Sequence, residues 1–209
     1  WKDRSITPYQ EELLGLLDDQ RFRDELPIFL SEGKIQESDL AEVLPIILRL
    51  LYGKVIAGKR GLETKRKSVF IGLKNRFGDD AIHKFLSIAF GPLSGTSVLQ
   101  GGALDEDLLR KDLIDTRKQV GILNMLDDLL STFKSTFGPF TVDVVDPIMY
   151  CLVKASRDLQ TVASSEDKEL EDGRKMQVSL LRTVRQRALQ SLARLFESCP
   201  DFEWYPYTA

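Results

Sequence analysis

Residues 43 to 53 read Val-Leu-Pro-Ile-Ile-Leu-Arg-Leu-Leu-Tyr-Gly, and they are the most informative segment of the chain about its architecture. Its apolar residues recur at spacings of three and four, which is typical of a helix. Ile46 and Leu50 add a second apolar face. A helix that is apolar on two faces needs neighbours on both sides, and this favours stacked helix pairs over a catalytic pocket.

The same helical spacing continues along the rest of the chain, whereas the alternation typical of strands is weak. Proline lies near the start of an apolar helix twice, at Pro45 and Pro147, and another helix follows each time. Residues 184–195 resemble the second helix of a HEAT repeat, with Ala188 allowing a close neighbour. We therefore predict an all-α fold, an α-solenoid of HEAT-like helical hairpins that is a fragment of a longer array. A compact helical bundle is the alternative.

Breaks in the helical pattern divide the chain into four parts. We expect leading helices of the array over 1–35, HEAT-like helices with a basic loop over 36–92, a flexible loop over 93–113, and HEAT-like helices over 114–209 with an acidic loop at 161–173. Expected helix starts are Thr7, Ser38 or Asp39, about Glu63, Asp79, and Asp115 or Thr116. A short element surrounds Pro27, one turn covers 105–110, two long helices cover 142–159 and 175–199, and the aromatic residues 201–207 fold back.

The composition bounds the class of protein. The 209 residues are 43% hydrophobic and 29% charged, which is typical of a folded chain, and the net charge of −3 leaves only local charge effects. No apolar run reaches the roughly 18 to 20 residues of a membrane span, so we expect no membrane partner. Cys151 and Cys199 lie in apolar helical contexts and are predicted to be reduced, buried thiols. Because the chain begins with Trp1, we expect a fragment of a longer protein.

The chain carries none of the residue patterns that catalysis requires. His83 is the single histidine, and it cannot by itself build a metal site or a catalytic triad. The glycines before Lys54 and Lys59 lack the spacing of a phosphate-binding loop. Asp127 and Asp128 are consecutive helical residues and point in different directions. We therefore predict no enzyme activity, no catalytic residue, no metal, no cofactor and no small-molecule substrate.

Two segments concentrate positive charge. Residues 54–76 hold eight lysines and arginines against one glutamate, a local net charge of +7, and residues 174–194 hold six with no acidic residue. Such clusters suit contact with a phosphate backbone. A solvated surface, or pairing with the acidic residues of 105–115 and 166–172, is the alternative, and the residues alone favour it. Phe70 is the only aromatic residue within either segment, which argues against base stacking. The candidate RNA-binding residues are Lys54, Lys59, Arg60, Lys65, Arg66, Lys67, Arg182 and Arg185.

Several motifs resemble a known family. These are Leu-Pro-Ile-Ile-Leu-Arg-Leu-Leu-Tyr-Gly-Lys at 44–54 followed by Lys-Arg-Lys-Ser at 65–68, then Phe-Leu-Ser-Ile-Ala-Phe-Gly-Pro at 85–92, Gly-Ile-Leu-Asn-Met-Leu-Asp-Asp at 121–128, and Val-Arg-Gln-Arg-Ala-Leu at 184–189. Over roughly residues 39–207 the chain is similar to the central region of the HEAT-repeat scaffold of the small-subunit processome, the "down-regulated in metastasis" family. The spacer between the first two motifs is short here, and residues 93–103 match nothing in that pattern.

This resemblance implies a non-enzymatic scaffold of the nucleus and nucleolus that acts in pre-ribosomal RNA processing. The expected partners are pre-ribosomal RNA, the small nucleolar RNP and other ribosome assembly factors, held along a helical-repeat surface. The alternative is a peptide-binding transport or adaptor solenoid of the nuclear import receptor type. Such a protein would carry a repeated row of Asn, Trp or acidic residues at helix-pair spacing, and no such row is present.

Overall fold

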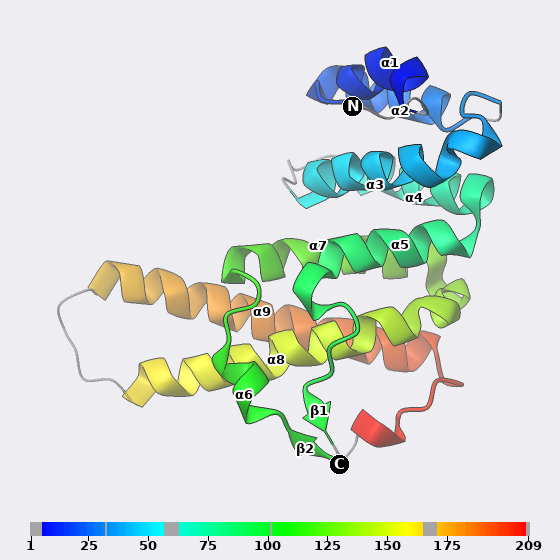
Figure 1. Ribbon diagram of the computed structural model, residues 1–209. Coiled ribbons are helices and arrows are strands. Elements are labelled where there is room, and N and C mark those ends of the chain that lie inside the picture. The colour runs from blue at the N-terminus through cyan, green and yellow to red at the C-terminus, as the bar shows by residue number, and fades with distance from the viewer. Residues whose placement is uncertain (1–5, 32, 57–62, 101, 165–170, 208–209) are drawn as a thin grey trace. The chain divides into compact units, whose positions relative to one another are not determined.

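The computed structural model describes residues 6–31, 33–56, 63–100, 102–164 and 171–207. These residues are mostly helical, as Figure 1 shows, which confirms the predicted all-α class. One two-stranded hairpin is the only sheet among them. The chain divides into two compact units, residues 1–89 and 90–209, each with its own apolar core.

The first unit is a series of short and medium helices. Its α-helices are α1 (Gln10–Gly15), α2 (Asp19–Phe29), α3 (Leu40–Ile56), α4 (Glu63–Phe77) and α5 (Asp79–Phe90), with 3-10 turns at Thr7–Tyr9 and Glu37–Asp39. The predicted short element around Pro27 is wrong in extent, because α2 begins eight residues earlier. The Asp18 carboxylate starts α2 by accepting hydrogen bonds from the Gln20 and Arg21 amides, both at 2.9 Å. Thr7 is the first residue of the 3-10 turn Thr7–Tyr9, and it does not precede that turn.

The core of the first unit takes buried apolar side chains from all five of its α-helices, and α3, α4 and α5 supply most of them. The stretch that predicts the fold buries its main apolar face through Val43, Leu44, Ile47, Leu48 and Leu51. The second face, Ile46 and Leu50, is half-buried. The rings of Phe70 and Phe85 join α4 to α5 with centroids 5.4 Å apart. Both aromatic side chains are fully buried, so this pair is central to the unit.

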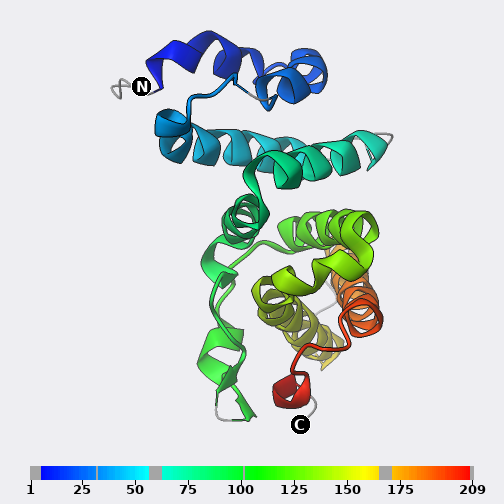
Figure 2. The same cartoon turned by 90° about the vertical axis from the view of Figure 1, so that its right-hand side faces the viewer.

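The second unit is built around three long helices. They are α7 (Thr116–Phe133), α8 (Thr141–Ser164) and α9 (Glu171–Ser198), preceded by β1 (Leu99–Gln100), β2 (Ala103–Leu104) and α6 (Glu106–Arg110). Figures 1 and 2 show α8 and α9 as an antiparallel hairpin, and α9 also packs along α7. Segment 93–113, expected to be a flexible loop, therefore contains a small hairpin and a helix. Within the acidic loop predicted at 161–173, α8 runs to Ser164 and α9 begins at Glu171, while residues 165–170 lie outside the described residues.

A corner of aromatic side chains joins α7 to α8. The intervening 3-10 segment Lys134–Phe140 brings Phe133, Phe137 and Phe140 together, with the Phe140 centroid 5.9 Å from Phe133 and 5.6 Å from Phe137. The chain turns at Lys134, whose φ of 48° lies in the left-handed region that favours glycine. The corner therefore combines a well-packed core with a locally unfavourable backbone.

Hydrogen bonds tie the flanking segments to α8. The Tyr150 hydroxyl donates to the Lys111 carbonyl at 2.6 Å and accepts from the Leu113 amide at 3.2 Å. The Ser97 hydroxyl, just before β1, donates to the Asp146 carboxylate at 2.8 Å. These bonds fasten the segment before β1 and the segment before α7 to the side of α8.

The aromatic tail folds back onto α9, as the sequence predicts. The Trp204 ring stacks on Phe196 with centroids 4.0 Å apart, and its indole nitrogen donates to the Cys199 carbonyl at 3.1 Å. The Tyr207 hydroxyl donates to Asp146. Burial, and then the negative charge of Asp146, raise the pKa of Tyr207 to about 12. The tail is thus held at both of its ends.

One continuous helical stretch passes a simple test for a membrane span. An 18-residue window within Thr116–Val162 has a mean hydropathy of 1.2, so the expectation that no such run exists is wrong by length and composition. Half of that window is buried inside the protein, and a core helix passes the same test. The stretch also contains the 3-10 corner between α7 and α8. It is weak evidence for a membrane span.

Candidate nucleic-acid interface

The eight predicted RNA-binding residues fall into two groups. Lys54 lies in the last turn of α3, while Lys65, Arg66 and Lys67 lie in the first turns of α4. Lys59 and Arg60 lie outside the described residues, and the side chains of Lys65 and Arg66 are not described either. Lys67 is half-buried. The remaining two, Arg182 and Arg185, are exposed on α9.

Lys54 is held by the first unit itself. Its ammonium group donates to the Leu17 carbonyl at 2.6 Å and lies 5.9 Å from the centroid of the Phe22 ring. Leu17 belongs to the turn between α1 and α2, where helix-end carbonyls need donors. Lys54 therefore connects the end of α3 to this turn, a structural role that does not depend on RNA.

Two further cations of segment 54–76 also have partners within the chain. The Lys74 ammonium lies 3.2 Å from the Asp79 carboxylate, at the junction of α4 and α5. The Arg76 guanidinium lies 5.3 Å from the centroid of the Phe77 ring. Positive charge in this segment thus serves partly to hold helix ends, and the RNA-binding prediction for its other residues stays a prediction.

The cations of α9 are used in two different ways. Arg194 forms an ion pair with Asp127 of α7, and Arg174 donates to the Val162 carbonyl in the last turn of α8. Those two arginines connect α9 to its neighbours. Arg174 supplies a donor to a carbonyl in the last turn of α8, which has no partner within its own helix. Arg182, Arg185 and Arg187 are exposed, and no ion pair to a described carboxylate is recorded for them.

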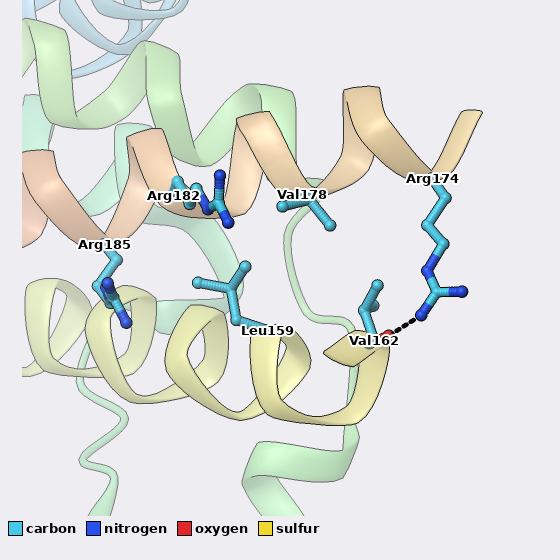
Figure 3. A pocket seen from close by; sticks show the side chains of 6 residues that line it. All are labelled: Leu159, Val162, Arg174, Val178, Arg182 and Arg185. Carbon is cyan, nitrogen blue, oxygen red and sulfur yellow. Dashed lines mark hydrogen bonds between the residues drawn. The ribbon is translucent and has the colours of Figure 1, made fainter. Parts of the chain in front are cut away.

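A groove lies between the end of α8 and the first half of α9. Its volume is about 320 Å³, and Figure 3 shows the six side chains that line it. Leu159 and Val162 come from α8, and Val178 faces them from α9. Arg174, Arg182 and Arg185 supply the charge. A neighbouring hollow of about 700 Å³ shares Arg174, Val178 and Arg182 and adds the polar side chains of Lys175, Ser179, Thr183 and Gln186.

The arrangement of the groove follows from helical spacing on α9. Residues 174, 178, 182 and 185 are separated by four, four and three positions, so they form one stripe along the helix. The stripe rises about 1.5 Å per residue, which places Arg182 and Arg185 about 4.5 Å apart along the axis. Two arginines at this spacing can bind one extended anionic group or two neighbouring ones. The sequence predicted these arginines but not the aliphatic floor, since the floor depends on how α8 faces α9.

A second hollow near α8 has the opposite character. Lys154 is buried between the carboxylates of Asp158 and Asp112, at 2.9 and 3.0 Å. Burial acts to lower the pKa of Lys154, but its hydrogen bonds to the two aspartates outweigh burial and the pKa is raised. Asp115 lines the same hollow. This side of α8 presents carboxylates around a neutralised lysine, whereas the groove with α9 presents arginines.

Catalytic and metal chemistry find little support among the described residues. Within the ranges given above, no three His, Cys, Asp or Glu side chains lie close enough to hold a metal ion. Cys151 and Cys199 are both buried free thiols, as predicted. Burial raises the pKa of Cys151 to about 12, so its thiolate form is scarce at neutral pH. The absence of an enzyme activity and of a cofactor remains a prediction.

Comparisons with known proteins give one consistent result. The family described as "U3 small nucleolar RNA-associated protein 20, N-terminal" matches residues 1–209. A relative from Schizosaccharomyces pombe, "U3 small nucleolar RNA-associated protein 20", is 27% identical over 99% of this chain. The relative of that name from Saccharomyces cerevisiae is 29% identical over 98% of the chain. The chain spans 8% of the length of each.

Proposed function

This chain belongs to the U3 small nucleolar RNA-associated protein 20 family, N-terminal part, and we propose that it is a non-enzymatic scaffold segment in small-subunit ribosome biogenesis. The family match over all 209 residues is the observation that carries the proposal. It agrees with the resemblance to the processome scaffold found in the sequence. The names of both relatives support an association with small nucleolar RNA, and hence a place in the nucleolus.

The helical architecture supports a scaffold role on physical grounds. Stacked helix pairs, here proposed to be HEAT-like, give each partner a long surface on which many weak contacts add up. The hollows of the second unit that are described above are open grooves along helices. Such surfaces suit extended macromolecules better than small substrates, which prefer enclosed apolar pockets with converging polar groups.

The scaffold is proposed to contact pre-ribosomal RNA through residues 54–76. Its support is the local charge of +7 in a chain whose net charge is −3. Lys54, Lys74 and Arg76 have partners inside the chain, so the RNA contact is assigned to Lys59, Arg60, Lys65, Arg66 and Lys67. Cations that neutralise phosphates release counterions, and the affinity then falls steeply with salt.

The proposal is tested with the tagged full-length protein in cells. We expect it to sediment with pre-ribosomal particles and to crosslink to RNA through residues 54–76. Reversing the charge of Lys65, Arg66 and Lys67 together to Glu should reduce the crosslinking. A matched control reverses the exposed Lys34, Lys84 and Lys118, which changes the total charge equally. Unchanged crosslinking in the first variant, or sedimentation with import cargo instead, would contradict the proposal.

A further inference from the structure

We propose that the groove between α8 and α9 is a docking site for an acidic amphipathic segment of a protein partner. The proposal rests on the proposed function only in that a scaffold supplies a reason for such a partner. It assigns Arg182 and Arg185 to protein recognition instead of RNA. Three observations carry it: the floor of the groove, its walls, and the charge of the surrounding helix surface.

The floor of the groove is aliphatic. Leu159 and Val162 of α8 and Val178 of α9 are each half-buried and turn toward the space between the two helices, as Figure 3 shows. Removing such side chains from contact with water lowers the free energy, so binding of an apolar group that covers them is favoured. A leucine or phenylalanine of a partner supplies that group.

The walls of the groove are arginine side chains. The guanidinium of Arg174 is fixed at one end by its bond to the Val162 carbonyl. Arg182 and Arg185 are exposed, and the side chain of Arg185 extends toward α8 in Figure 3. Guanidinium groups bind carboxylates with paired hydrogen bonds, so these two positions suit Asp or Glu side chains on either side of an apolar anchor.

The surface of α9 is positively charged from Gly173 to Phe196, after Glu171 and Asp172 have begun the helix. No acidic residue occurs from Gly173 to Phe196, and Lys175 and Arg187 add further positive charge on exposed positions. Electrostatic complementarity therefore selects an acidic partner and speeds its approach. The carboxylates around Lys154 lie in a different hollow, lined by Asp112, Asp115 and Asp158, so they disfavour binding of the same partner on that side.

The floor favours protein over RNA as the occupant. A nucleic acid bound through its phosphates needs only the cations and leaves three aliphatic side chains uncovered. One bound through its bases needs aromatic or planar platforms, and none of the six described side chains that line the groove is aromatic. A helix with apolar residues at spacings of three and four and acidic residues between them satisfies both floor and walls.

The test measures fluorescence anisotropy with the 209-residue chain. The probe is a fluorescein-labelled peptide of roughly 16 residues, about 24 Å long as a helix, with leucines at spacings of three and four and Asp or Glu elsewhere. We expect saturable binding that is weakened by replacing the leucines with serine. A labelled RNA duplex of about the same length is measured in parallel, since duplex RNA is the competing ligand class.

Three variants locate the binding site. Arg182→Glu with Arg185→Glu should weaken peptide binding about tenfold or more, because two attractive contacts become repulsive. Val178→Asp should weaken it as well, since the apolar anchor then meets a charge. The matched control, Arg187→Glu with Lys118→Glu, changes the charge equally outside the groove and should have a smaller effect. Circular dichroism melting of each variant verifies that the fold is retained.

Two outcomes overturn the proposal. One is that the peptide fails to bind, or binds equally well to the groove variants and the control. The other is that the RNA duplex binds more tightly than the peptide and loses affinity in the arginine variant but not in Val178→Asp, which would make the arginines an RNA contact. Failure of the scaffold function appears separately, as loss of sedimentation with pre-ribosomal particles while peptide binding persists.

Discussion

The two lysine- and arginine-rich segments, 54–76 and 174–194, resemble each other in sequence but differ in structure. In the first, Lys54, Lys74 and Arg76 each contact a carbonyl, a carboxylate or an aromatic ring of their own unit. In the second, Arg182 and Arg185 are exposed beside an aliphatic floor. Local charge density therefore does not show whether a cation holds the fold together or remains exposed to solvent. The position of each residue relative to neighbouring helices does.

The first pair of variants tests whether the two compact units have separate cores. Phe140 is fully buried in the aromatic corner of the second unit, and Phe70 is fully buried in the first. Each Phe→Ala change should cost about 3–5 kcal/mol, because it removes a packed ring and leaves a cavity. Hydrogen exchange followed by mass spectrometry should show faster exchange in α7, α8 and α9 for Phe140→Ala and in α3, α4 and α5 for Phe70→Ala. Equal acceleration of both units by either variant would contradict the division.

The next test compares a structural with an available cation directly. Lys54→Ala removes the bond to the Leu17 carbonyl and the contact with Phe22, so we expect a loss of about 1–2 kcal/mol in unfolding free energy. Arg182→Ala should change it by less than about 0.5 kcal/mol, as is usual for exposed positions. Chemical denaturation measures both. A loss at Arg182 as large as that at Lys54 would remove the distinction drawn between the two regions.

A smaller effect is expected at two turns with left-handed backbone. The turn between α4 and α5 uses Gly78 at φ 73°, whereas the corner after α7 uses Lys134 at φ 48°. Lys134→Gly should therefore stabilise the second unit by about 1 kcal/mol, because glycine adopts this region without steric strain. Gly78→Ala should destabilise the first unit by a similar amount. Thermal melting of both variants measures the pair, and a destabilised Lys134→Gly would show that the lysine is not strained.

The smallest effect concerns the tail at alkaline pH. Because the folded pKa of Tyr207 is about 12, above the value of about 10 for an unfolded tyrosine, its stabilising contribution is complete below pH 10. That contribution is lost as the pH rises through 12. In a Trp1→Phe background, Trp204 fluorescence should change over this window as the stack on Phe196 loosens. The Tyr207→Phe variant is the control, and an identical change in it would assign the effect to other groups.

Much of the helical pattern could be predicted from the sequence, because caps and apolar spacing are local. The helix α4 spans 63–77 as expected, and α7 begins after Asp115, whose carboxylate accepts from the Arg117 amide at 2.9 Å. The first half of α2, which begins at Asp19 after its Asp18 cap, is not indicated by the apolar pattern, because that pattern is concentrated around Pro27. Residues 161–164 and 171–173, which the sequence predicts as loop, are helical, since polar residues do not prevent a helix from continuing.

The candidate site was less predictable, because it depends on residues distant in sequence. Lys54 has a structural role because it donates to the carbonyl of Leu17, which lies 37 positions earlier in the chain. The groove depends on the alignment of Leu159 with Val178 across two helices, which no local pattern encodes. The arginines could be named from the sequence, but not the floor beside them.

The bond from Arg174 to the Val162 carbonyl joins the facing ends of α8 and α9, and α9 also packs on α7. Non-covalent contacts therefore hold α8 and α9 together in addition to the covalent chain between them. A gene split between codons 166 and 167 should yield two polypeptides that reassemble when co-expressed, which native mass spectrometry would detect. The hairpin thus offers a place to build a complementation reporter without dismantling the second unit.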